Sequence, residues 1–110
     1  MGKVFVVLED YDNGMEYEDA RFYSGVFRGV FSTMKEARGC IEGYVLADYY
    51  EAVDRCEMEM MINEDCFYNR DDIFRFNIEE DEDDRITINS DVYHNGCMGM
   101  TKYRIVEKDI

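Results

Sequence analysis

The stretch "FNIEEDEDDRITIN", Phe76 to Asn89, decides the fold of this chain. Apolar and polar side chains alternate on both sides of six consecutive acidic residues, Glu79 to Asp84. Alternation with a period of two predicts strands with one buried face, and the acidic run between them predicts a hairpin turn. A turn centred on Glu82 gives two cross-strand pairs, Ile78 opposite Ile86 and Phe76 opposite Ile88.

A second turn follows at Asn95-Gly96, a dipeptide typical of two-residue hairpin loops. This turn predicts that Ile88 faces Tyr103 and that Ile86 faces Ile105. Both turns place the same apolar row on one face of the sheet. Two independent registers that agree predict a three-stranded antiparallel meander in the C-terminal third.

The N-terminal third predicts two further strands. The apolar run Val4–Leu8 is typical of a buried strand, and "RFYSGVFRGVF", residues 21–31, predicts a second one. In this second strand, Gly25 and Gly29 indicate a bulge or a close packing contact. A tight turn at Asn13-Gly14 would place two carboxylates opposite each other, which is unfavourable. We therefore expect a loose acidic loop over residues 9–19 rather than two long, regular strands.

Between these strand regions, residues 31–56 predict a helix. Thr33 and Glu36 match a capping box at its start, and apolar residues then recur with a period of 3.6. Gly39 and Gly43 weaken the pattern and would permit a break near the middle. Residues 58–72 fit a helix tail, a second short helix or a loop. The whole predicts one two-layer α+β domain over residues 1–110, of order β-β-α-β-β-β, with an antiparallel sheet packed on one main helix.

Charge limits the classes of partner. The chain has 26 acidic and 12 basic residues, a formal net charge of −14. Such a chain repels phosphate, so we expect neither direct nucleic-acid binding nor membrane binding, whereas a basic protein surface would attract it. No apolar run of 18 residues and no signal-peptide pattern is present, and the four cysteines form no CxxC pair. These features predict a cytoplasmic protein with reduced thiols.

Catalytic and metal-binding patterns are weak. His94 and Cys97 could form a nucleophile pair, but no third residue that would orient them is evident, and no phosphate-binding or hydrolase motif is present. Zinc sites usually show paired ligands, which this chain lacks. The segment "DYDNGMEYED" begins like a calcium loop, yet Gly14 is one position early and Arg21 occupies the place of the bidentate glutamate. We therefore expect a protein without catalytic residues, metal or cofactor, with a non-standard calcium site as the alternative.

Two acidic windows are the predicted partner-binding residues. Neither window contains a lysine or arginine, and carboxylates on one side of a strand recur at about 6.6–6.8 Å, as a ladder of negative charge. Merely solvated turns are the alternative interpretation. The residues are Glu9, Asp10, Asp12, Glu16, Glu18, Asp19, Glu79, Glu80, Asp81, Glu82, Asp83 and Asp84.

The first 45 residues resemble small, acidic proteins of bacteriophages and mobile elements. The pattern is an apolar strand, a polar hairpin and a "VFST-x-x-x-A" step from strand to helix, carried here by Val30, Phe31, Ser32, Thr33, Glu36 and Ala37. The resemblance implies no catalytic residue. It implies a context in which some members inhibit host defence nucleases, a few by imitating DNA. The resulting hypothesis is a non-enzymatic anti-CRISPR or anti-restriction protein that occupies the basic surface of such a nuclease. The alternative is a calcium- or small-ligand-binding accessory domain.

Overall fold

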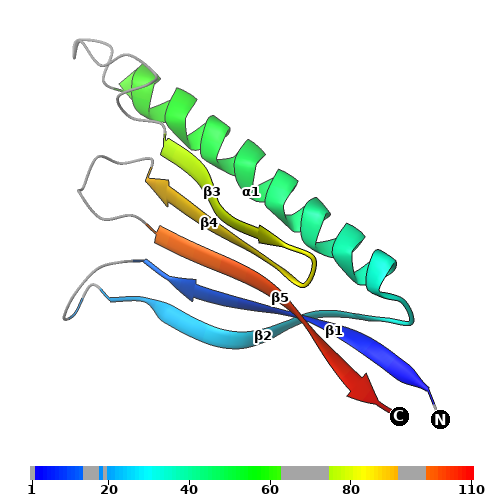
Figure 1. Cartoon of the computed structure of the whole chain (residues 1–110). Coiled ribbons are helices and arrows are strands. Elements are labelled where there is room, and N and C mark those ends of the chain that lie inside the picture. Colours follow the sequence, from blue (N-terminus) through cyan, green and yellow to red (C-terminus); the bar gives the residue numbers. More distant parts are fainter. Residues whose placement is uncertain (1, 14–17, 19, 63–74, 92–98) are drawn as a thin grey trace.

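The computed structural model describes residues 2–13, 18, 20–62, 75–91 and 99–110. Five strands and one helix follow one another in the predicted order, which confirms the α+β fold (Figure 1). The elements are β1 (Lys3–Asp12), β2 (Phe22–Phe31), α1 (Met34–Ile62), β3 (Arg75–Glu82), β4 (Arg85–Asp91) and β5 (Gly99–Asp109).

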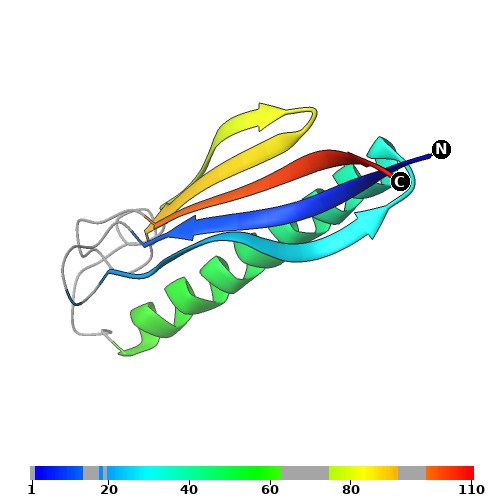
Figure 2. The same ribbon diagram turned by 90° about the horizontal axis from the view of Figure 1, so that it is seen from below.

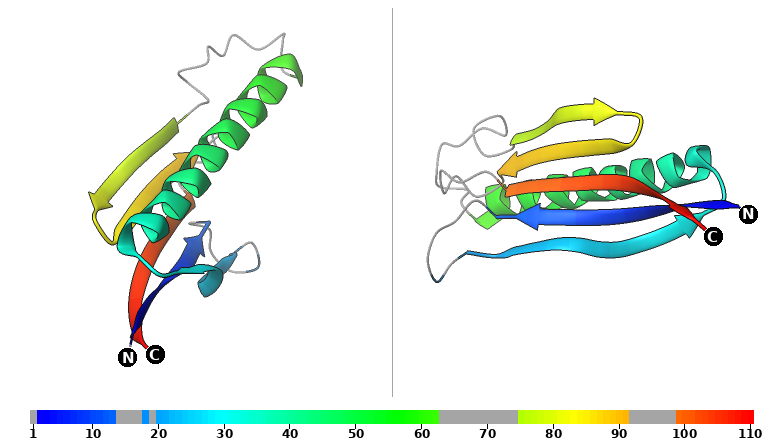
Figure 3. Two further views of the ribbon diagram at one scale, coloured as in Figure 1. Left: turned by 90° about the vertical axis from the view of Figure 1, so that its right-hand side faces the viewer. Right: turned by 60° about the horizontal axis from the view of Figure 1, so that its bottom comes forward.

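All five strands form one antiparallel sheet in the order β2-β1-β5-β4-β3, so β1 and β5 meet at its centre. Figure 2 shows α1 as a second layer beneath this sheet, running along the strands. In the described part of the chain no element covers the opposite face, which we call the open face. The two views of Figure 3 show the twist of the sheet and the five strands side by side.

The expected loose loop over residues 9–19 is wrong over its first part. β1 continues to Asp12, and Glu9 pairs with Val26 of β2. Two bulges in β2 make the long strands acceptable. One places Arg28 out of register beside Gly29, and the other lies at Gly25, whose φ of 70° is the left-handed conformation that glycine tolerates. The prediction of a bulge or close contact at both glycines is therefore confirmed.

In the meander the strands are confirmed but both predicted registers are wrong. The first turn consists of Asp83 and Asp84 alone, and a bulge follows Ile78, so Ile78 pairs with Ile88. Likewise Ile86 pairs with Tyr103, and Ile88 pairs with Thr101. The β4–β5 register differs from the predicted one by two residues, which keeps every side chain on its predicted face of the sheet. Ile78, however, is 53% exposed because it lies on the edge strand. The Asn95-Gly96 turn lies outside the described residues.

The helix is continuous over 29 residues, without the break near its middle that the glycines would permit. Gly39 and Gly43 both lie at exposed positions where an added Cβ would meet nothing within 4 Å, and there glycine weakens a helix without bending it. At the start, the Glu36 amide donates to the Thr33 hydroxyl, as the capping box predicts. The helix covers a core whose buried members come from α1, β1, β4 and β5, with Phe31 of β2 and Phe76 of β3 packed against it. The buried members are Val7, Ala37, Ile41, Ile86, Ile88, Tyr103 and Ile105.

Candidate functional site

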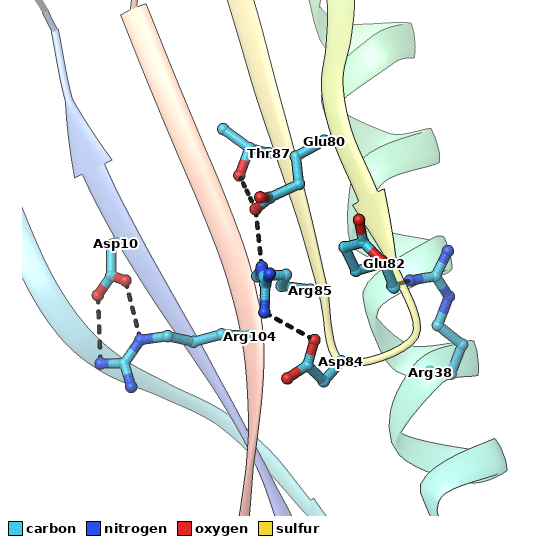
Figure 4. A network of polar contacts seen from close by, with 8 residues as sticks. All are labelled: Asp10, Arg38, Glu80, Glu82, Asp84, Arg85, Thr87 and Arg104. Carbon is cyan, nitrogen blue, oxygen red and sulfur yellow. Dashed lines mark hydrogen bonds and ion pairs between the residues drawn. The ribbon is translucent and has the colours of Figure 1, made fainter.

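The acidic window at residues 79–84 forms the end of β3 and the turn into β4. Two arginines contact it (Figure 4). Arg85 binds the carboxylates of Glu80 and Asp84 at 2.9 and 3.1 Å. Arg38 reaches from α1 to the Asp81 carboxylate and to the main-chain carbonyl of Glu82. The window is therefore partly neutralised by neighbours in space, and these contacts hold the hairpin against the helix.

Glu79 and Asp83 complete this window. Both side chains are exposed, and neither forms an ion pair within the part of the chain that the structure describes. Glu82 is also exposed, and its carboxylate lies on the open face with that of Glu80. These exposed carboxylates are the ones that a partner surface could reach.

The other acidic window is divided between the two faces of the sheet. Glu9 faces the helix and is only 5% exposed, so it is not available to a docking surface. Asp10 faces the open side, where Arg104, Ser24 and the Gly25 amide bind its carboxylate. Asp12 is exposed at the end of β1. Glu18 is exposed too, whereas Glu16 and Asp19 lie outside the described residues.

The structure does not bring the two windows together. Asp12 and Asn89 both pair with Met100, so the end of β1 lies level with the far end of β4. The turn at Asp83 and Asp84 precedes the opposite end of β4. Figure 1 shows these two places separated by the length of that strand.

A cavity of about 420 Å³ lies between α1 and the sheet, beside the apolar core. Every one of the six elements contributes to its wall, and the wall is rich in carboxylates and tyrosines. The polar and aromatic residues on which its chemistry depends are Glu9, Tyr11, Tyr23, Arg28, Tyr44, Asp48, Glu51 and Tyr103.

On the sheet side of this cavity, Glu9 is held by two residues of β2. The Arg28 guanidinium donates to both carboxylate oxygens of Glu9 at 3.2 Å, and the Tyr23 hydroxyl donates to the same group. Burial and the Glu9 charge raise the pKa of Tyr23 to about 12. The phenol therefore stays protonated and remains a donor at neutral pH.

On the helix side, Asp48 accepts a hydrogen bond from the Tyr103 hydroxyl of β5. Burial raises the pKa of Asp48, and the charges of Glu9 and Glu51 add to this rise, against the lowering effect of the Tyr103 hydrogen bond. The ring of Tyr103 stacks on Tyr44 with centroids 5.6 Å apart. The cavity thus combines desolvated carboxylates with aromatic walls.

Our sequence reasoning did not single out this cavity. It named Glu9, but as a partner-binding surface residue. One pattern could have indicated the site: Tyr44, Asp48 and Glu51 recur at intervals of four and three, which places them on one side of a helix. The contribution of Arg28 depends on the bulge beside Gly29, and the sequence does not show which side chain that bulge turns toward the helix.

The calcium-like segment, residues 10–19, lies partly outside the described residues. Among the described residues, no group of three or more His, Cys, Asp or Glu side chains is arranged to hold a metal ion. Asp10, the first residue of the calcium-like segment, is already bound by Arg104. His94 and Cys97, the candidate nucleophile pair, fall outside the described residues.

Two further findings concern the chain as a whole. Within the described segments, no helix is both long and apolar enough to cross a bilayer. No protein-family model, curated protein or solved structure matches the chain.

Proposed function

We propose that this protein is a non-enzymatic inhibitor of phage type that occupies the basic nucleic-acid-binding surface of a host defence nuclease. The proposal places it in the host cytoplasm, acting on a CRISPR or restriction effector. Its acidic surface would compete with DNA or RNA for the lysines and arginines of that effector. The partner is a basic protein surface, and neither nucleic acid nor membrane is bound directly.

The observation that supports this proposal is the acidic β3–β4 hairpin on a chain of net charge −14. Arg38 binds the main-chain carbonyl of Glu82 and Arg85 binds the Glu80 carboxylate, while Glu79, Glu82 and Asp83 stay exposed. Carboxylates in fixed positions lose little conformational entropy on binding and steer a basic partner toward them. Asp10, Asp12 and Glu18 extend the acidic surface from the other end of β4, and Glu9 does not belong to it.

A pull-down from bacterial lysate tests this function. The immobilised protein is expected to retain a nucleic-acid enzyme at low salt and to release it at high salt, because long-range ionic contacts are screened. Retention should fail when the enzyme is loaded with nucleic acid beforehand. The double variant Glu79→Lys, Asp83→Lys should lose most of the binding.

The matched control is the double variant Asp54→Lys, Asp109→Lys, which changes the net charge equally at exposed positions on α1 and at the end of β5. It should keep most of the binding if the hairpin makes the contact. Equal binding by wild type and both variants would contradict the proposal. Equal loss in both variants would show an effect of overall charge rather than recognition through the hairpin.

The cavity favours the small-ligand alternative over the calcium alternative. Its volume lies in the range of small-molecule sites, about 300–1,000 Å³, and hydrogen-bonded polar groups converge on it. This second candidate function does not require the hairpin.

A further inference from the structure

The central strand β1 is apolar on both of its faces. Phe5 and Val7 belong to the core beneath α1, whereas Val4, Val6 and Leu8 alternate with them and therefore point to the open face. An antiparallel sheet with one solvated face usually carries polar side chains on that face, and a strand that is apolar throughout is typical of a sheet covered on both sides. The pattern of β1 therefore indicates that the open face is itself a contact surface.

The neighbouring strands widen this apolar strip. Val6 lies between Val30 of β2 and Val106 of β5. Leu8 lies beside Phe27 of β2. Phe27 is 61% exposed and Val30 is 52% exposed, although both adjoin the centre of the sheet. We call these side chains the apolar patch, and its members are Val4, Val6, Leu8, Phe27, Val30 and Val106.

The charges around the apolar patch are balanced, although the chain as a whole has a net charge of −14. Two arginines of the open face bind carboxylates of the same face, and two lysines of β5 form no ion pair within the part of the chain that the structure describes. A protein this acidic repels a second copy of itself over most of its surface, so two copies approach with least repulsion through this face. The basic side chains here are Arg85, Lys102, Arg104 and Lys108, and the acidic side chains that the structure describes here are Asp10, Asp12, Glu80 and Glu82.

The open face is large enough for a specific contact. β1 and β2 have ten residues each, and β5 has eleven. At a rise of about 3.3 Å per residue and a spacing of about 4.8 Å between strands, the sheet presents roughly 700 Å² on this face. A standard protein interface buries about 800 Å² on each partner. Two open faces packed against each other therefore approach the size of a stable dimer interface.

We propose that the open face is the interface of a homodimer, in which two copies of this chain pack their sheets face to face through the apolar patch. The dimer has four layers, with the two sheets inside and one α1 helix on each outer side (Figure 2 shows one half). A basic partner is attracted most strongly to the acidic hairpin and not to this balanced face, so a second copy is the occupant that the charges favour. This inference goes beyond the proposed function and does not depend on it.

The register of the sheet also favours one orientation of the two copies. Packed sheets commonly keep their strands aligned within about 30°. With the two-fold axis along β1, β5 of one copy lies over β2 of the other. Arg104 and Phe27 flank Leu8 on opposite sides, so Arg104 would face Phe27 of the partner subunit. A guanidinium on an aromatic ring is favourable, whereas stacking β5 on β5 would bring cations together.

Sedimentation velocity across a dilution series tests the dimer. We expect a species of twice the 13.1-kDa mass of the chain at high concentration, and the monomer on dilution. Added salt should strengthen the dimer, because it screens the repulsion between two acidic copies. Binding of a nuclease through the hairpin is expected to weaken with salt, so the two contacts differ in the sign of their salt dependence.

A pair of variants locates the interface. Phe27→Thr, Val30→Thr removes apolar side chains from the patch and keeps residues that suit strands, so it should raise the dimer dissociation constant about tenfold or more. The matched control, Leu46→Gln, Ile78→Thr, removes two side chains that are each 53% exposed but lie away from the open face. The control should dimerise like wild type. If the double variant does not fold, Phe27→Thr alone should still weaken the dimer.

Three outcomes would overturn the proposal. The wild-type protein could stay monomeric at every concentration and salt level. The control could weaken the dimer as much as the patch variant does, which would place the interface elsewhere. The dimer could also dissociate with added salt, which would show a contact made by charges rather than by the apolar patch. None of these outcomes bears on retention of a nuclease through the hairpin, so the two proposals fail separately.

Discussion

Asp10 lies on the open face of the sheet, whereas Asp48 belongs to α1, which covers the other face. Their pKa values shift in opposite directions. Partial burial by itself raises the pKa of Asp10, but hydrogen bonds from Arg104, Gly25 and Ser24 outweigh it and lower the pKa. Asp48 is more deeply buried and its pKa is raised. Asp10 therefore stabilises the fold as an anion, whereas ionised Asp48 opposes folding.

The first prediction follows from these signs. The raised pKa means that the folded state binds the Asp48 proton more tightly, so its contribution to stability falls as pH rises through that pKa. Asp48→Asn should therefore gain stability relative to wild type as pH rises from about 4 to 7. Asp10→Asn should lose stability relative to wild type at lower pH, as pH rises from about 2 to 4, because the pKa of Asp10 is lowered in the folded state. Urea unfolding across these two pH ranges measures both differences, and equal trends in the two variants would refute the assignment.

Glycines in different environments provide the second prediction. Gly25 has a φ of 70°, so Gly25→Ala should lower the free energy of unfolding by about 1–2 kcal/mol. Gly39 lies in the helix with no other group within 4 Å of an added Cβ, so Gly39→Ala should raise it by about 0.5–1 kcal/mol. Chemical denaturation of both variants checks the opposite signs. Destabilisation by Gly39→Ala would mean that the position is not open as described.

At the scale of elements, the ion pair between β1 and β2 has a structural role. The Glu9 side chain is only 6% exposed, and Arg28 of the neighbouring strand supplies its countercharge. A buried carboxylate without a partner is costly, and its protonation then becomes favourable. The bulge that points Arg28 toward Glu9 therefore makes an acidic residue acceptable in a central strand.

The third prediction tests this role. Arg28→Met keeps most of the side-chain volume and should lower the free energy of unfolding by about 2–3 kcal/mol, less than for a fully buried pair because Arg28 is one-third exposed. The double variant Glu9→Gln, Arg28→Met should recover part of that loss. Denaturant unfolding of the three proteins measures it. A double variant no more stable than Arg28→Met would show that the charge of Glu9 is not the cause.

Sequence patterns predicted the elements better than their pairing. Alternation at Ile86 and Ile88 and the cap at Thr33 depend on neighbours in the chain, and both are confirmed. Registers depend on bulges and on the position of the turn. The turn lies at Asp83 and Asp84 rather than around Glu82, and together with the bulge after Ile78 this shifts the β3 pairing by two residues. The helix continued through Gly39 because packing along its buried side outweighs the weak propensity of exposed glycines.

At the scale of the whole molecule, the charged side chains are distributed unevenly, and the two acidic windows do not form one surface. Four of the 12 basic residues, Arg85, Lys102, Arg104 and Lys108, lie on the open face of β4 and β5. Exposed acids lie at the hairpin end and along α1, and also at Asp12 and Glu18 and at the end of β5. The sequence showed the excess of acid correctly, but the arginines that contact the acidic residues are separated from them by up to 94 residues in the chain, as Arg104 is from Asp10.

The cavity could not be predicted for the same reason. Its wall combines side chains from all six elements, and the Tyr103–Asp48 hydrogen bond joins residues 55 positions apart. Sequence patterns report local periodicity and cannot show which distant residues share a space. They did show the composition of the chain, which is rich in tyrosine and in carboxylate side chains.

The pairing of β1 with β5 has a consequence for how the chain acquires its structure. Lys3 lies opposite Asp109, so the innermost ladder of the sheet joins segments separated by almost the entire sequence. Contacts this distant slow folding, since a large loop must close before they form. During synthesis, β1, β2 and α1 emerge from the ribosome long before β5, the strand that pairs with β1 at the centre of the sheet. Until β5 is made, the apolar side of α1 is unprotected. Nascent chains stalled before residue 99 should therefore depend on chaperones, whereas released chains should not.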